Sequence, residues 1–536
     1  MFKKWHGNPW AILITLSLGF FMTLLDLTIV NIAIPDLGAD LDASLDQILW
    51  VVNAYTLALA VLLITGGRLG DLRGKRNLFA TGVAVFTLAS LACGLAQDPT
   101  QLVAFRAVQG LGAALLMPQT LSIIAEVFPA ERRGVAMGIW GTVAGVSGAL
   151  GPILGGALIT HLSWRWIFFV NLPLGALVLV LTVTIIPAGR RTVRHRLDTL
   201  GVALASTALF CLAFGLTEGQ RYDWNRWIWG LFVLAGVFFA AFLLHERGQQ
   251  TKEPLVPFSL FRDRNFTLIN FVGVTVSFGV VGMFLPLTIY LQSVLGYSAL
   301  KSGLVLLPIA LGSFVTAGPA GAFADKIGGK FILMGGLLAW AGGLLWVVSV
   351  ADVGSNWPSI AFPLLLIGLG VGCTFAPMAT EVMRGVPAGL AGAASGVTNA
   401  LRQVGSVLAG AVVGAVLQAQ LSSALTDRAR ESAGQLPAAY RDSFVGAFSR
   451  AEADVSAQQQ AGTPRGVPQD VAERMRALGG QVFGHGFVDA MGPAVYVSAA
   501  VLLAGALACL AVRRYRGSSA NPHALPMSEP ELEEAA

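Results

Sequence analysis

Charged residues are scarce in this sequence for its length. Lysine, arginine, aspartate and glutamate make up 12% of the 536 residues, about half the share that soluble domains carry. A soluble chain of this size would divide into several domains with charged surfaces between them. Here 55% of the residues are hydrophobic and lie in long runs, with the charges grouped between the runs. This pattern excludes an ordinary soluble protein and predicts an all-α integral membrane protein.

Cysteine and histidine are also scarce. The four cysteines all lie in apolar runs, which excludes a disulfide framework and metal-ligand spacing. The six histidines are scattered, so the convergent constellation that an integral-membrane enzyme would need is lacking. We therefore expect no metal, no cofactor and no enzymatic activity, with a membrane enzyme or receptor as the remote alternative. The net charge of +5 has an explanation at the membrane surface, so we expect no nucleic-acid partner.

Fourteen segments are long and apolar enough to cross a bilayer, which takes about 20 residues. The first is too long for the core of a signal peptide. Because the count is even, both ends of the chain should face the same side. The segments lie near 10–34, 48–69, 77–96, 101–126, 134–160, 165–187, 199–217, 227–244, 266–294, 302–323, 330–350, 358–382, 390–418 and 489–512.

Basic residues fall in alternate connections between these segments, from Lys3 and Lys4 at the start to Arg513 and Arg514 near the end. The intervening short connections are neutral or acidic, as at Asp36. Because cytoplasmic loops carry an excess of lysine and arginine, we expect both termini to be cytoplasmic. The chain is thus predicted to be a multi-pass protein of a cytoplasmic membrane, with the lipid bilayer as its constant partner.

A weak internal repeat follows the second and tenth segments. Gly67, Gly70, Asp71, Gly74, Lys75 and Arg76 lie in the first copy, and Gly321, Asp325, Gly328 and Lys330 occupy matching positions in the second. Glycines allow a tight turn, and the aspartate can accept hydrogen bonds from the N-terminus of a neighbouring helix. We interpret the loop as a latch that holds two halves closed on the cytoplasmic side. A solvated turn would explain the cations, but not the repeated aspartate and glycines.

The copies are eight segments apart rather than six, which predicts two six-helix halves with two helices inserted between them. We divide the chain into an N-terminal half (1–187), an insertion with flanking cytoplasmic loops (188–265), a C-terminal half (266–512) and a disordered cytoplasmic tail (513–536). Within the C-terminal half, 419–488 is too polar to span. Its apolar residues recur at helical spacing, which predicts an external amphipathic helical hairpin. A self-packed loop, a lid and a partner-docking element are the alternatives for it.

Ionisable side chains at membrane depth are costly and are candidates for function. Asp26 in the first segment and Arg106 in the fourth should lie at similar depths, because the two segments run in opposite directions. An Asp26–Arg106 pair would form a proton switch in which protonation of Asp26 releases Arg106. A permanent structural ion pair is the alternative. The polar residues that could line a substrate cavity are Asn31, Asn53, Gln109, Gln292, Asn399, Arg402 and Gln403.

The fifth segment is rich in glycine, with Gly148, Gly151, Pro152, Gly155 and Gly156. Small residues at this density allow helices to approach closely, and proline bends the helix axis. We expect this face to pack tightly and to seal or hinge the pathway.

Together these motifs resemble the major facilitator superfamily, and within it the fourteen-helix drug:proton antiporters of the QacA/EmrB type. The resemblance covers residues 8–515. Leu25 to Pro35 is similar to the family's first-helix motif, and Gly67 to Arg76 to its cytoplasmic loop motif. Arg106 to Gly110 is similar to the fourth-helix motif, and Gly151 to Gly156 to the antiporter motif.

The resemblance implies the major facilitator fold and proton-coupled export, with Asp26 as the proton site, Arg106 as its coupling partner and protons as the coupling ion. Members that export divalent cations carry extra carboxylates in late helices, and this chain has Asn399, Arg402 and Gln403 there instead. We therefore expect neutral, monocationic or anionic substrates.

The sequence thus predicts a monomeric multidrug exporter in a bacterial inner membrane. Its substrates would be small lipophilic drugs, dyes or antibiotics, and their export would confer antibiotic resistance on the cell. A dedicated exporter of an endogenous siderophore, peptide, lipid or self-made antibiotic is the alternative.

Overall fold

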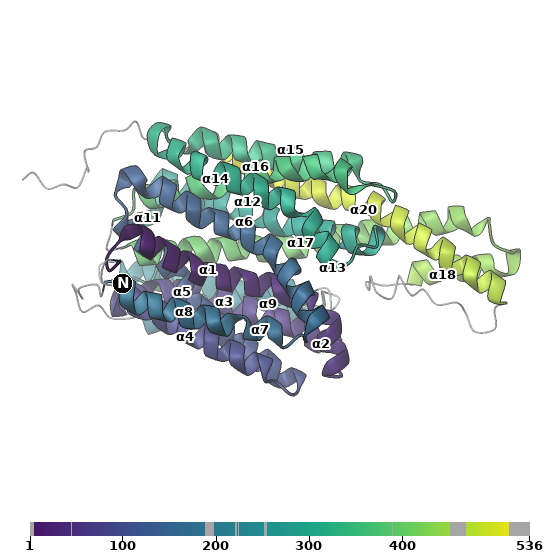
Figure 1. Cartoon of the computed structure of the whole chain (residues 1–536), viewed down its shortest axis with the longest axis horizontal. Helices are drawn as coiled ribbons and strands as arrows, with labels where there is room; N and C mark the ends of the chain where they lie inside the picture. The colour runs from purple at the N-terminus through teal and green to yellow at the C-terminus, as the bar shows by residue number, and fades with distance from the viewer. Residues whose placement is uncertain are drawn as a thin grey trace, which may run out of the picture.

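The computed structural model describes residues 5–43, 45–187, 198–219, 222, 224–250, 254–387, 390–450 and 468–513. All regular elements in these ranges are helical, and the long helices lie side by side in one elongated bundle (Figure 1). The first half contains α1 (Pro9–Ile32), α2 (Ile34–Asp40), α3 (Leu45–Arg73), α4 (Lys75–Gly94), α5 (Pro99–Val127), α6 (Ala130–His161), α7 (Trp166–Phe169) and α8 (Asn171–Ile185). The remainder contains α9 (Thr199–Glu218), α10 (Arg226–Gln249), α11 (Ser259–Arg262), α12 (Arg264–Ile289), the π-helical turn η2 (Tyr290–Val294), α13 (Ala299–Val305), α14 (Leu307–Ile327), α15 (Lys330–Val350), α16 (Trp357–Arg384), α17 (Ala391–Ala433), α18 (Ala438–Arg450) and α20 (Gln469–Ala511).

Thirteen helices of the described residues are long and apolar enough to cross a membrane. Each of the fourteen predicted segments lies on one helix or on two consecutive helices, and the segment at 134–160 lies on α6, which is not among the thirteen. The all-helical membrane architecture is therefore confirmed. The count of fourteen crossings and the cytoplasmic position of the termini stay predictions. Of the predicted tail at 513–536, residues 514–536 lie outside the described residues.

Polar caps mark where many of these helices begin. Asn8 accepts hydrogen bonds from the backbone N–H groups of the first turn of α1, and Asp98 does the same for α5. Asp198, Asn225 and Asp263 cap α9, α10 and α12. Because the first N–H groups of a helix have no partner within the helix, such caps stabilise its start. Each of these capping residues lies directly before an apolar helix.

The predicted internal repeat has matching backbone geometry in its two copies. Gly74 lies between α3 and α4 with φ 94°, and Gly328 lies between α14 and α15 with φ 87°. This left-handed region favours glycine, so both turns depend on that residue type. In the first half α5 packs against α3 and α4, and in the second α16 packs against α14 and α15. The two copies thus share a turn geometry and a packing arrangement, and the division of the chain into halves stays a prediction.

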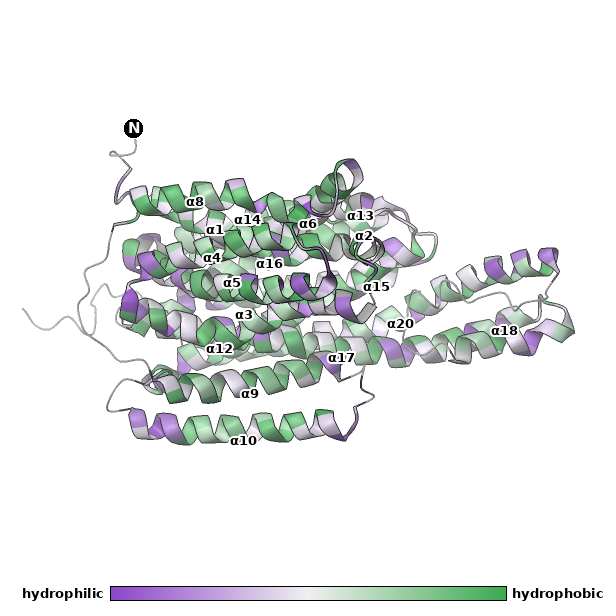
Figure 2. Cartoon of the chain, turned by 90° about the horizontal axis from the view of Figure 1, so that it is seen from below, coloured by the Kyte–Doolittle hydropathy of each residue, from purple (hydrophilic) through white to green (hydrophobic). Residues whose placement is uncertain are grey.

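The inserted helices lie at one edge of the bundle, where α9 separates α10 from the remaining helices (Figure 2). α10 packs mainly against α9, and α9 packs in turn against α3 and α17. α9 therefore contacts one helix from each predicted half.

The structure differs from the prediction for 419–488 in where the helices end. α17 continues to Ala433 and α20 already begins at Gln469, so both helices extend past the rest of the bundle, away from where α1 begins (Figure 1). The short α18 packs on this extension, and 451–467, which is part of the predicted hairpin, lies outside the described residues. Along the extension of α17, buried apolar residues recur at four-residue spacing while the opposite face of the helix becomes polar. A count of hydrophobic residues averages the two faces and therefore misses this part of the helix. The buried stripe comprises Leu417, Leu421, Leu425, Ala429 and Ala433.

Candidate functional site

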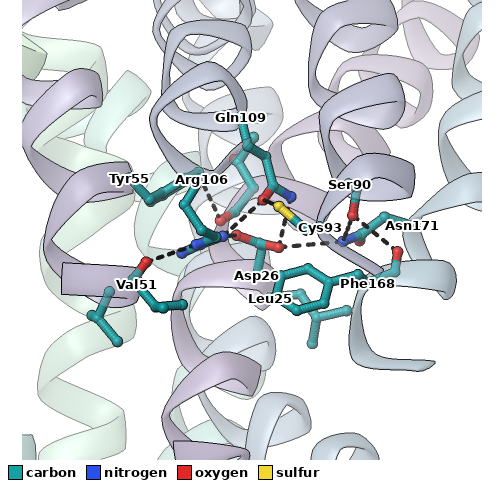
Figure 3. Close-up of polar contacts among 12 residues, drawn as sticks. Leu25, Asp26, Val51, Tyr55, Ser90, Cys93, Arg106, Gln109, Phe168 and Asn171 are labelled. Carbon is teal, nitrogen blue, oxygen red and sulfur yellow. Dashed lines mark hydrogen bonds and ion pairs between the residues drawn. The ribbon is translucent and has the colours of Figure 1, made fainter. Parts of the chain in front are cut away.

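Asp26 of α1 and Arg106 of α5 form an ion pair in the interior of the first half (Figure 3). The side chains are 0% and 1% exposed, respectively. Arg106 Nη1 donates to Asp26 Oδ2. Sequence reasoning placed these two residues at similar depth, and the structure brings them into direct contact. A pair removed from water in this way is stable only while both charges are present and hydrogen-bonded.

The other oxygen of Asp26 is held by two amide side chains. Gln109 Nε2 donates to Asp26 Oδ1 over 2.8 Å, while Gln109 Oε1 accepts from Arg106 Nη1 over 2.9 Å. Asn171 Nδ2 lies 3.3 Å from the same Asp26 oxygen and 3.1 Å from Ser90 Oγ. The carboxylate on α1 is thus held from α5 and α8, and Ser90 on α4 in turn holds Asn171. Gln109, which the sequence assigns to a substrate cavity, contacts both members of the ion pair.

Arg106 has further contacts on α3. Its Nε donates to the carbonyl oxygen of Val51 over 3.0 Å, and its guanidinium carbon lies 4.3 Å from the centre of the Tyr55 ring. Tyr55 is fully buried and donates through its hydroxyl to Thr23 O on α1. A guanidinium over an aromatic face gains cation–π attraction. If Asp26 became protonated, Arg106 would keep only dipoles and a ring as partners, which favours its movement.

Asn171 and Ser90 belong to this site, and sequence reasoning missed them as functional residues. Asn171 is the first residue of α8, and Ser90 lies on α4 and donates to Phe168 O over 2.9 Å. Both side chains are buried. The sequence does show both as polar residues within apolar segments. It does not show which neighbour each side chain contacts.

The loop motif that begins at Gly67 connects the two predicted halves. Asp71 of α3 accepts hydrogen bonds from the backbone N–H groups of Gly392 (3.2 Å) and Ala393 (3.0 Å) in the first turn of α17. Negative charge is stabilised at a helix N-terminus. The helices approach so closely here that a Cβ on Gly67 would lie 2.5 Å from Gly392 O, and one on Gly70 would lie 1.9 Å from the side-chain oxygen of Gln119.

The cations of the motif bind within the first half. Lys75 contacts Glu126 at the end of α5 and lies 3.6 Å from Asp71. Arg76 donates to the carbonyl oxygen of Val183 over 2.8 Å. In this structure the cations thus fasten α3, α4, α5 and α8 to one another, while Asp71 provides the contact with the other half.

The second copy of the motif uses a related arrangement. Glu381 at the end of α16 accepts from the backbone N–H of Gly329 over 2.7 Å and pairs with Arg384 over 2.9 Å. Arg384 also donates to Ala324 O. Glu381 thus holds the turn after α14 as Glu126 holds the turn after α3. The side chain of Asp325, the counterpart of Asp71, lies outside the described residues.

The glycine-rich face of α6 packs against both halves. A Cβ on Gly151 would lie 2.0 Å from Thr28 Oγ1 of α1, and Thr28 donates to Ser147 O over 3.3 Å. Nearer the start of α6, a Cβ on Gly138 would lie 2.6 Å from Ala317 O of α14. Gly155 is buried and Gly156 is half-buried. The surroundings of Gly148 and Pro152 lie outside what the structure describes.

The residues predicted to line one substrate cavity are dispersed. Arg402 lies on α17 with its guanidinium carbon 5.2 Å from the centre of the Phe375 ring and its Nε 3.4 Å from Ser277 Oγ. Asn399 bonds to Ser395 O on its own helix, and Gln292 is half-buried in η2. The surroundings of Asn31 lie outside the described residues.

Asn53 and Gln403 line two neighbouring pockets beside the inserted helix α9. The first pocket also contains Glu218, a carboxylate that sequence reasoning missed because the predicted segment ended at 217. Glu218 is 4% exposed and accepts from Asn53 Nδ2 over 3.4 Å.

Within the described ranges, no group of three histidine, cysteine, aspartate or glutamate side chains lies close enough to hold a metal ion. The four cysteines are free, and three of them are buried while Cys373 is half-buried.

Comparison with known proteins identifies a family. The sequence profile of the Major Facilitator Superfamily matches residues 16–410. The chain is 34% identical over 525 residues to the tetracenomycin C resistance and export protein of Streptomyces glaucescens, an alignment that covers 97% of this chain and 95% of that protein. It is 37% identical over 402 residues to the multidrug resistance protein Stp of Mycobacterium tuberculosis strain H37Rv, covering 74% and 73% of the two chains.

The fold is similar to those of two solved transporters. The human organic anion transporter MFSD10 (TETRAN) matches with a TM-score of 0.59 at 14% identity, covering 94% of this chain and 99% of that one. The proton:xylose symporter XylE matches with a TM-score of 0.59 at 14% identity, covering 94% and 96%. At this identity the likeness concerns the fold alone.

Proposed function

Because this chain belongs to the major facilitator superfamily and is a membrane transporter, we propose that it exports small lipophilic drugs, dyes or antibiotics in exchange for protons. The names of its relatives as resistance and export proteins support the substrate class and the direction. The observation that carries proton coupling is the buried Asp26–Arg106 pair. It provides one carboxylate that can take up a proton and a cation that responds to the change.

In the proposed cycle, protonation of Asp26 frees Arg106, and release of the proton re-forms the pair. Leaving a buried charge without its partner costs roughly 3–5 kcal/mol. A membrane potential of about 100 mV supplies about 2.3 kcal/mol per charge, and each pH unit across the membrane adds about 1.4 kcal/mol. A proton gradient therefore supplies energy of the same order as the switch requires.

The contact of Asp71 with α17 supports the proposal that the halves alternate about a closed cytoplasmic gate. With the termini cytoplasmic, this contact seals the inner end of the bundle in the present conformation. Rocking of the halves would part Asp71 from α17 and admit substrate from the inside. We propose that the protein does this as a monomer in a bacterial cytoplasmic membrane, with no cofactor and with protons as the coupling ion.

The second candidate is a dedicated exporter of an anionic endogenous product, and Arg402 favours it. Among the described residues, Arg402 has Ser277 and Phe375 as polar and aromatic neighbours, and no ion pair with a carboxylate is formed. A cation without a counter-charge at membrane depth attracts anions. A substrate screen that includes carboxylate-bearing compounds separates the two candidates, because only the second predicts that the cargo is confined to anions.

The proposal is tested by dye efflux from cells that express the chain, with and without a protonophore. We expect Asp26→Asn, which keeps the shape of the side chain and removes its titration, to abolish gradient-driven efflux at unchanged expression. Asp442→Asn on the exposed face of α18 is the matched control and should transport normally. Efflux by the Asp26→Asn variant at the wild-type rate would make Asp26 structural, and efflux indifferent to the protonophore would refute antiport.

A further inference from the structure

The connection between α10 and α11 is buried, although connections usually run over the surface of a protein. Leu255 and Val256 are 1% and 7% exposed, and Pro257 is buried as well. A connection removed from water needs partners for its backbone N–H and C=O groups. We call residues 254–258 the strap. The strap leads from the inserted helices into the second half, at the end of the bundle where α1 begins (Figure 1).

The end of α10 provides these partners through two side chains. Glu246 Oε1 accepts a hydrogen bond from the N–H of Leu255 over 3.2 Å, and Glu246 Oε2 accepts one from the N–H of Val256 over 3.3 Å. Gln250 Nε2 donates to Val256 O over 3.2 Å, and Gln250 Oε1 accepts from the N–H of Phe258 over 2.8 Å. Glu246 is 0% exposed. Burying a carboxylate is costly without such donors, so Glu246 and the strap stabilise each other in this position.

The part of α10 that holds the strap is itself anchored. His245 Nε2 lies 2.9 Å from each carboxylate oxygen of Asp198. Asp198 also caps the start of α9, where it accepts from the N–H of Gly201 over 2.9 Å. α9 packs in turn against α3 and α17. The strap is therefore held by the inserted pair of helices, and that pair packs on one helix from each predicted half.

The strap lies where α3 and α17 approach each other. Leu255 and Val256 belong to one buried apolar cluster with Val397 of α17, and Ile64 of α3 packs against this cluster. The backbones of the two helices are close at the same level, because a Cβ on Gly396 would lie 3.2 Å from Ile64 O. The apolar side chains of the strap thus cover the seam between α3 and α17.

We propose that the strap is a second element of the inner gate, and that the inserted helices serve to hold it there. The contact of Asp71 with α17 lies about one helical turn from this cluster. The inference rests on the proposed export function, because it takes the separation of α3 from α17 as the opening step. Separation would expose the apolar side chains of the strap unless the strap left the seam. Their burial therefore stabilises the closed gate.

Two elements that close the same seam are coupled. A change that frees the strap must favour the separation of α3 from α17, and a change that separates these helices must free the strap to the same extent. A connection that only joins the inserted helices to the second half would have no such coupling, because freeing it would leave the seam as it was. Measuring the coupling in both directions therefore distinguishes a gate element from a plain linker.

The test is alkylation by N-ethylmaleimide of the full-length protein in lipid nanodiscs, with the four native cysteines replaced. Val256→Cys reports on the strap, and Ser395→Cys, at a position of α17 that is 0% exposed, reports on the seam. Because the strap is held through its backbone, Val256→Cys leaves all four hydrogen bonds to Glu246 and Gln250 in place.

We expect Glu246→Ala, which removes both acceptors of the carboxylate, to raise the alkylation rate about tenfold at each reporter, as the loss of hydrogen bonds to a charged group implies. Gln250→Ala removes the other two bonds and should raise the rate at both reporters as well. In the opposite direction, Asp71→Asn should raise the rate at Val256→Cys as it does at Ser395→Cys.

Two control variants are matched to these changes. Gln249→Ala removes the neighbouring amide and none of the four bonds, and Glu473→Ala removes an exposed carboxylate of α20. Both should be labelled at the rate of their parents, and the thermal unfolding midpoint of every variant shows whether it is folded. A folded Glu246→Ala protein that is labelled faster at Val256→Cys but not at Ser395→Cys would overturn the inference. Labelling of both reporters at the parental rate would overturn it too.

If Glu246→Ala does not fold, Gln250→Ala decides by the same comparison. The Asp26 efflux experiment does not depend on the result, so the export function and the role of the strap can fail separately. An unchanged rate at Ser395→Cys in Asp71→Asn would refute the gate and the inference together. A seam that opens in Asp71→Asn while the strap stays protected would refute the inference alone.

Discussion

Removing the charge of Asp71 should loosen the contact between the halves by a calculable amount. Asp71 is 7% exposed and accepts two hydrogen bonds from the first turn of α17. Hydrogen bonds to charged groups contribute about 1.5–3 kcal/mol each, and neutral ones about 0.5–1.5 kcal/mol. In Asp71→Asn the amide oxygen still accepts, but without the charge that the helix N-terminus favours. We expect the closed state to lose about 2 kcal/mol, which shifts the balance between closed and open states about 30-fold.

Cysteine alkylation measures this shift. In a chain whose four native cysteines are replaced, Ser395→Cys places a thiol at a position on α17 that is 0% exposed and packs against α5 through Pro118 O. When alkylation is slow compared with opening, its rate follows the open fraction. Asp71→Asn should raise the rate about 30-fold in nanodiscs, and Asp442→Asn should leave it unchanged. If Asp71→Asn and its parent were labelled at the same rate, Asp71 would not hold the halves together.

Two stability predictions follow from the packing. Gly151→Ala would force a methyl group to 2.0 Å from Thr28 Oγ1 and should lower the free energy of unfolding by about 1–3 kcal/mol. Gly410→Ala is the control and should leave that free energy unchanged, because a Cβ there meets no atom within 4 Å. Denaturation of the two purified variants checks this, and equal stability would show that α1 and α6 can separate freely. Leu425→Ala removes a side chain that is 0% exposed from the extension and should cost about 2–5 kcal/mol, against little for the exposed Val412→Ala. A thermal unfolding midpoint that drops no further for Leu425→Ala than for Val412→Ala would mean that the extension is not part of the cooperative core.

The positions of the helices could be predicted because each depends on a local property. In a membrane a run of about 20 apolar residues satisfies its backbone as a helix, so the predicted segments fall on helices of the structure, some of them on two consecutive ones. The contact between Asp26 and Arg106 was also within reach, since depth along two oppositely directed segments can be counted. The turns at Gly74 and Gly328 followed from residue type, because only glycine adopts their backbone conformation at low cost.

The surroundings of polar residues could not be predicted in the same way. Gln109 contacts the ion pair and Asn53 faces α9, although both are amides within apolar helices. Which neighbour an amide reaches depends on how each helix is rotated about its axis, and this is set by packing between segments far apart in the sequence. Glu218 was missed for the same reason, since only the position of α9 against α3 makes it a buried residue. The extension of α17 was missed because hydropathy averages the buried stripe with the polar face.

The length of α17 makes it a lever. The helix begins at the seam that Asp71 closes and continues without interruption for 43 residues, about 64 Å, to the far tip of the extension. A tilt of about 10° about its first turn would carry that tip through about 11 Å. α20 runs beside it and is tied to it by the Arg428–Asp489 ion pair, so the two helices would swing together. A small change of angle at the seam is thus magnified at the tip of the extension, where a pair of spectroscopic labels could follow the movement of the two helices.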